Sequence, residues 1–187
     1  SDSEKYIVEK DIIRLILNFG NNNILVINNK NNKEEETTVA RYIINEIGAD
    51  ELEFQHPVYK IIYVDIEQQI RSGNPVTEKH FIHHSNETVS RVAVDLLTSA
   101  YDLSKIWEKH DNYVETEDMK LKEIVPEIIN AFKNKKVLDM IKETHKKLKI
   151  AQENNDTDSV SLLQQKFILL NNLKKNFSKD LGYRIIV

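Results

Sequence analysis

The chain has 187 residues, of which 40% are hydrophobic and 30% are charged. This composition is that of a folded protein with a sizeable core, and it argues against intrinsic disorder. The sequence contains no cysteine, which excludes disulfides and thiolate metal sites. It has no apolar run long enough to span a membrane and no signal peptide, so we expect a cytoplasmic protein. Its net charge of −4, with both signs interleaved, disfavours direct binding of nucleic acid.

Apolar residues recur at helical spacing through the first half of the chain. Glycines follow the predicted helices, and we expect each glycine to end its helix in the left-handed conformation. These are Gly20 after residues 6–19, Gly48 after 39–47, Gly73 after 58–72, and Gly182 after the last long helix. The predicted helices also have residues suited to begin them. These are Thr37 and Thr38, Pro57 after His56, Thr77, Ser85, and Asp158 or Ser159.

One short segment, Ile24–Ile27, has the residue types of a strand. It is too short and too isolated to seed a sheet by itself. We therefore predict that the Asn-rich and then acidic stretch from Asn21 to Glu36 is a solvated surface loop.

From Thr116 onward the pattern changes to that of two long helices. Residues 117–153 are predicted to form one helix or two collinear ones, with a bend or a restart at Pro126. A polar turn, residues 154–157, precedes a returning helix whose apolar residues run from Val160 to Phe177. We therefore predict an all-α fold, with an N-terminal helical bundle in residues 1–114 and a long C-terminal helical hairpin in residues 115–187.

The sequence contains no convincing catalytic or metal site. His80 and His84 are spaced to share one side of a helix, close to His83, but no Glu-x-x-His pattern and no cysteine completes a zinc site. The acidic runs 34–36 and 115–118 are explained by solvation and by the helix dipole. Phosphate-binding glycine loops and hydrolase motifs are absent. We predict no catalytic residue, no metal and no cofactor.

Lysines are frequent along the hairpin, at residues 133–149 and 174–179. They indicate either a solvated helix face or a surface that meets an acidic protein, with nucleic acid as a further alternative. Trp107 is expected to seat the hairpin on the bundle or to contact a partner. Self-association through the hairpin is also open.

Six segments, in their order along the chain, resemble the C-terminal region of bacterial DNA primase (DnaG), most closely its Bacteroides-group version. They are residues 9–17 with Gly20, 39–44, 50–59, 92–97, 103–108 and 181–187. The resemblance spans essentially the whole chain. It depends on the order of these segments, with the hairpin last, because each segment alone is an ordinary amphipathic helix.

The resemblance implies a non-catalytic domain that binds the N-terminal domain of the replicative helicase (DnaB), recruits primase to the replication fork and modulates the helicase. Its bundle is expected to be similar to that helicase domain, and the tail of the single-stranded DNA-binding protein is a second candidate partner. The chain begins at Ser1 rather than Met, so we expect the catalytic part to lie upstream. The residues predicted to contact the helicase are Lys146, Lys149, Gln152, Gln164, Gln165, Leu169, Asn172, Lys175 and Tyr183. Those predicted to be structural are Trp107, Pro126, Gly20 and Gly73.

Overall fold

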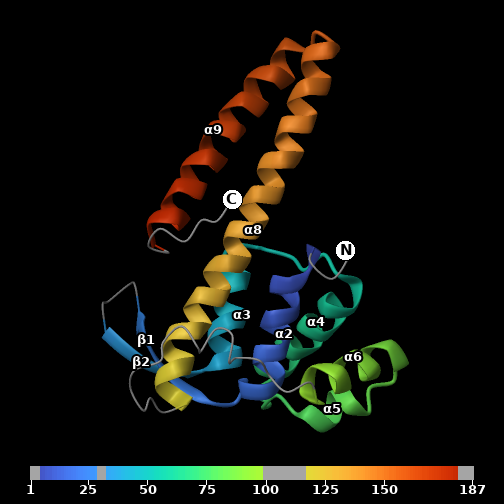
Figure 1. Cartoon of the computed structure of the whole chain (residues 1–187), viewed down its shortest axis with the longest axis vertical. Coiled ribbons are helices and arrows are strands. Elements are labelled where there is room, and N and C mark those ends of the chain that lie inside the picture. The colour runs from blue at the N-terminus through green and yellow to red at the C-terminus, as the bar shows by residue number, and fades with distance from the viewer. Residues whose placement is uncertain (1–4, 29–32, 99–116, 181–187) are drawn as a thin grey trace. The chain divides into compact units, whose positions relative to one another are not determined.

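The structure is a computed structural model that describes residues 5–28, 33–98 and 117–180. These residues form seven helices and one two-stranded sheet (Figure 1). The predicted helical fold is therefore confirmed, with a small sheet in addition. The chain divides into two compact units, Ser1–Ile129 and Asn130–Val187, and the boundary predicted after residue 114 lies outside the described residues. No helix in the described ranges is both long and apolar enough to cross a membrane.

The first unit is organised around helix α2 (Ile7–Phe19), which contacts α3, α4 and α6. Its fully buried residues Ile12, Ile13, Leu15 and Ile16 do not share one narrow face, so neighbours are needed on several sides of the helix. The other helices of this unit are α3 (Val39–Ala49), α4 (Pro57–Arg71), α5 (Glu78–Ile82), α6 (Glu87–Thr98) and the first part of α8 (Glu117–Glu153).

A buried carboxylate ties α2 to the start of α4. Glu9 is only 5% exposed, and its two carboxylate oxygens accept hydrogen bonds from the backbone N–H groups of Gln55 and His56, each at 2.8 Å. Pro57 occupies the first turn of α4, as predicted, and His56 caps it by accepting the Tyr59 N–H on Nδ1 at 3.3 Å. The buried charge is thus compensated by donors that immediately precede the helix.

The prediction of a loop from Asn21 to Glu36 is wrong. Strands β1 (Asn23–Asn28) and β2 (Lys33–Thr38) pair in antiparallel register, with Asn23 opposite Thr38. Ile24 is buried whereas Leu25 is exposed, so alternate residues of β1 face the core. The sequence KEEETT of β2 shows no hydrophobic alternation, and its extended form depends on pairing with β1.

The glycines behave in three different ways. Gly73 has a φ of +79°, as predicted for a left-handed helix end. The left-handed prediction is wrong for Gly20, whose φ is −57°; a side chain there would instead collide with the Ile16 carbonyl oxygen. It is also wrong for Gly48, which lies inside α3 and has open space around it. Gly182 lies outside the described residues.

The predicted helix starts are partly right. Thr38 caps α3 by accepting the Arg41 N–H at 3.3 Å, and Thr77 precedes α5. Asn86 rather than Ser85 accepts the first N–H groups of α6. Helix α9 (Thr157–Asp180) is capped by Asp156, not by Asp158 or Ser159. The Asp156 carboxylate accepts the Ser159 N–H at 3.1 Å, and the hydrogen bonds from Ser159 lower the pKa of Asp156.

The second unit contains the predicted helical hairpin, which is confirmed. Of the alternatives predicted for residues 117–153, one helix or two collinear ones, the structure has one: helix α8 continues through Pro126 without a restart. Helix α9 (Thr157–Asp180) returns beside it after a turn in which Asn155 has a φ of 56° (Figure 1). Buried and half-buried side chains alternate in steps of three and four on both helices, which is the spacing of an antiparallel coiled coil. We call these residues the seam: Val137, Ile141, Thr144, Leu148 and Ala151 on α8, and Val160, Leu163, Phe167, Leu170, Lys174 and Phe177 on α9.

Two glycines in different backbone conformations, Gly73 at a helix end and Gly48 inside a helix, provide a matched pair of substitutions. We expect Gly73→Ala to destabilise the protein by about 1–2 kcal/mol, because alanine disfavours the left-handed conformation. We expect Gly48→Ala to stabilise it by about 0.5–1 kcal/mol, because alanine favours the helix and meets no neighbour. Urea unfolding followed by circular dichroism measures both, and shifts of the same sign would contradict this account.

A second substitution tests the Glu9 contact. We expect Glu9→Gln to destabilise the first unit by about 1–3 kcal/mol, because an amide can accept with only one atom where the carboxylate accepts with two. Glu123→Gln, at an exposed position of α8, serves as the control and should leave the urea midpoint unchanged. Equal midpoints for wild type and Glu9→Gln would show that the contact contributes little.

Candidate functional site

The predicted helicase contacts lie on the protein surface wherever the structure describes them. The eight positions from Lys146 to Lys175 are all exposed. Tyr183 and the predicted structural residue Trp107 lie outside the described residues. The positions do not form one patch: Lys146 and Lys149 are on α8, Gln152 is near the turn, and the remaining five are on α9.

Three of these residues belong to a continuous row on α9. Gln165, Leu169 and Asn172 lie between two further exposed leucines, Leu162 and Leu173. Their spacing of i, i+3, i+7, i+10 and i+11 places all five within an arc of roughly 100° on a helix of 3.6 residues per turn. We call these five residues the α9 stripe, and they lie away from the seam that faces α8.

The leucines give the α9 stripe its chemical character. Leu162 is 68% exposed, Leu169 is 61% exposed and Leu173 is 39% exposed. A row of large apolar side chains held in water, with amide groups beside it, is typical of a surface that binds another protein. The sequence reasoning missed Leu162 and Leu173, although the seven-residue step from Leu162 to Leu169 could have revealed a second apolar row on this helix.

The two compact units carry opposite net charges. Residues 1–129 contain 14 Lys and Arg against 24 Asp and Glu, which gives −10, whereas residues 130–187 contain 12 against 6, which gives +6. The net charge of −4 for the whole chain therefore averages an acidic unit with a basic one. Since surface charges act over roughly 8–10 Å at physiological salt, a ligand of the hairpin experiences the local positive charge.

A cluster of ionisable side chains forms in the first unit around Asp65 of α4. His80 Nε2 lies 2.6 Å from Asp65 Oδ2, and His84 Nε2 lies 3.5 Å from the same oxygen. The three potential ligand atoms are within 4.8 Å of one another. The sequence spacing indicated that His80 and His84 could converge, but it gave no sign of Asp65, which α4 contributes.

The hydrogen bonding of His84 argues against a metal in this cluster. Its Nδ1 accepts the backbone N–H of Asn86 at 3.0 Å. An accepting Nδ1 carries no proton, so the proton of the neutral ring is on Nε2, the nitrogen that faces Asp65. A metal bound at Nε2 would require the lone pair that this proton occupies, and the cluster is therefore better explained as a polar link between α4 and the end of α5.

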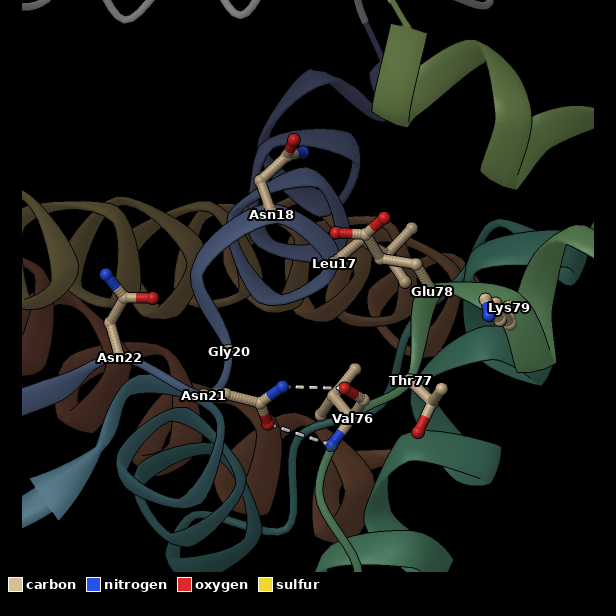
Figure 2. A pocket seen from close by; sticks show the side chains of 9 residues that line it. All are labelled: Leu17, Asn18, Gly20, Asn21, Asn22, Val76, Thr77, Glu78 and Lys79. Carbon is tan, nitrogen blue, oxygen red and sulfur yellow. Dashed lines mark hydrogen bonds between the residues drawn. The ribbon is translucent and has the colours of Figure 1, made fainter.

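A shallow depression of about 440 Å³ lies where the end of α2 meets the segment before α5 (Figure 2). Asn21 spans it with two hydrogen bonds: its Nδ2 donates to the Val76 carbonyl at 2.7 Å, and its Oδ1 accepts the Val76 N–H at 3.0 Å. Asn18 Nδ2 donates to the Arg14 and Leu96 carbonyls. These amides are already engaged with backbone groups, so they serve the fold.

The α9 stripe is thus the described surface with the clearest binding character, and comparison with known proteins adds the family. Residues 1–185 match the family described as "Domain of unknown function (DUF8430)". The chain belongs to this family. No curated protein and no solved structure matches the chain. The description of DUF8430 names no activity, so a functional proposal depends on the chemistry of the chain's own surfaces.

The reading of the histidine cluster can be tested with zinc. We expect about a tenfold molar excess of Zn²⁺ to leave the thermal midpoint unchanged, because a metal that bound the folded state would raise it. Differential scanning calorimetry makes the measurement, with His84→Ala as the matched variant. A rise in the midpoint that His84→Ala abolishes would contradict the hydrogen-bonding argument and assign a metal site.

Proposed function

We propose that this chain is a non-catalytic domain of a DNA primase that binds the N-terminal domain of the replicative helicase (DnaB) through the α9 stripe. The observation that carries the proposal is the row of exposed leucines at Leu162, Leu169 and Leu173. The resemblance of the sequence segments to the C-terminal region of DnaG supplies the identity of the partner.

The α9 stripe has the composition that a helix contact needs. Its leucines can be removed from water by an apolar groove, and each fully buried leucine contributes about 1.5–3 kcal/mol. The side-chain amides of Gln165 and Asn172 can form hydrogen bonds beside this apolar centre, as polar groups do around protein interfaces. The seam packs α9 against α8, so the row is presented on a preformed helix, and little conformational entropy is lost on binding.

Binding alone is sufficient to modulate a helicase. A ligand that binds one arrangement of a multi-subunit enzyme better than another shifts the population towards the first. The domain would therefore need no catalytic group to change the rate of unwinding. The remaining predicted contacts on α9, Gln164 and Lys175, would border the stripe in this arrangement.

The proposal predicts a specific loss of affinity. We expect Leu169→Asp to weaken binding to the helicase N-terminal domain of the same organism by about tenfold or more, because a carboxylate replaces an apolar contact at the centre of the row. Isothermal titration calorimetry with the whole chain measures the affinity, and circular dichroism verifies that the hairpin stays helical.

The matched control is Ile150→Asp, which changes a residue of the same hairpin that is 56% exposed but lies on α8 outside the stripe. It should bind as the wild type does. Equal affinities for wild type and Leu169→Asp would contradict the placement of the site. If the wild-type chain does not bind the helicase domain but forms a dimer that Leu169→Asp disrupts, the stripe is a self-association surface and the proposal is wrong.

A further inference from the structure

The hairpin has a second outer surface, which is made of lysines. Lys142, Lys146 and Lys149 are exposed on α8 at a spacing of i, i+4 and i+7, which places them on one side of the helix over a length of roughly 10 Å. They point roughly 150° away from the seam residues of α8. We call these three residues the α8 lysine row, and it is separate from the α9 stripe.

The two carboxylates on the N-terminal side of the row and within it, Asp139 and Glu143, already have lysine partners outside the row. Lys135 Nζ forms an ion pair with Asp139 Oδ1 at 2.7 Å, and Lys147 Nζ forms one with Glu143 Oε1 at 2.6 Å. The hydrogen bond from Lys147 lowers the pKa of Glu143, as expected for a carboxylate in an ion pair.

The row itself has no such partner. Within the described part of the chain, the side chains of Lys142, Lys146 and Lys149 form no ion pair or hydrogen bond. Glu153, one turn beyond Lys149, is the next acidic residue towards the turn. Three lysines without a directly bonded carboxylate therefore lie in line on one helix.

The composition of the row indicates which acidic ligand it suits, an acidic protein surface or the phosphates of a nucleic acid. Protein interfaces have an apolar centre and are depleted in lysine. On residues 120–153 of α8 the exposed large apolar side chains are Met140 and Ile150, one beyond each end of the row, so the row has no apolar centre. Lysines aligned without an apolar centre are typical of contacts to the phosphates of a nucleic acid, whose binding is driven by the release of counterions. Residues 133–153 of α8 contain no Phe, Tyr or Trp, which argues against recognition of bases by stacking.

We propose that the α8 lysine row binds the phosphodiester backbone of a nucleic acid without sequence preference. The inference goes beyond the helicase contact and does not depend on it, because it concerns a different helix and a different chemistry. It also assigns a role to Lys146 and Lys149 that differs from the helicase contact predicted for them. The charge of +6 on residues 130–187 supports it, although the whole chain is acidic.

The experiment is fluorescence anisotropy of the whole chain with a labelled oligonucleotide, single-stranded or as a duplex, over a series of salt concentrations. We expect the triple variant Lys142→Gln, Lys146→Gln and Lys149→Gln to bind about tenfold more weakly or worse at low salt. The slope of log affinity against log salt should fall by about 2 for single strands, since each lost phosphate contact contributes about 0.7. The two probes show which form of nucleic acid the row prefers.

The control removes the same charge elsewhere on the hairpin, in Lys147→Gln, Lys166→Gln and Lys175→Gln, all of which are exposed. It should retain most of the affinity and the slope. Equal losses in both triple variants would overturn the proposal, because net charge alone would then explain binding. The proposal would also be wrong if the chain bound neither oligonucleotide at low salt, or if it bound poly-glutamate as tightly as DNA. The triple variant of the α8 lysine row should bind the helicase domain as the wild type does. A failure of the nucleic-acid proposal can therefore be told apart from a failure of the helicase proposal.

Discussion

The first unit depends on a carboxylate that is buried inside it. Glu9 contributes a charge to the otherwise apolar surroundings of α2 and compensates for its burial by accepting two backbone N–H groups just before α4. Asn21 has a comparable role beyond the other end of α2, where it bridges to the backbone of Val76. Non-helical segments, whose backbone groups have no partners within a helix, are thereby fixed to both ends of the central helix. These two side chains thus help to position α4 and the segment before α5, alongside the apolar core.

The second unit separates two kinds of surface on two helices. Its seam uses one side of α8 and one side of α9, which leaves an apolar and amide-containing row on α9 and a lysine row on α8. The turn at residues 154–156 joins the helices closely, so ligands on the two surfaces would be held by one short element. This arrangement suits a domain that acts by bringing other molecules together.

Sequence periodicity predicted the helices and the hairpin because an amphipathic helix repeats its pattern locally. It failed for β2, whose strand form depends on a partner, and for Gly48, where the helix simply continues. Asp65 was missed because its meeting with His80 results from the packing of α4 against other elements. The α9 stripe was found only in part: Leu169 was predicted as a contact, whereas Leu162 and Leu173 on the same side of the helix were not. The whole-chain charge was misleading because it summed two units of opposite sign.

Pro126 has a consequence for the way α8 opens. A proline donates no N–H, so the carbonyl of Lys122, four residues earlier, has no donor within the helix. The helix is uninterrupted in its geometry, but its ladder of hydrogen bonds has a gap shortly before the division between the units at Ile129. Cooperative opening is expected to stop at such gaps. Amide deuterium exchange should then report two protection levels along one continuous helix, one for each unit that it joins.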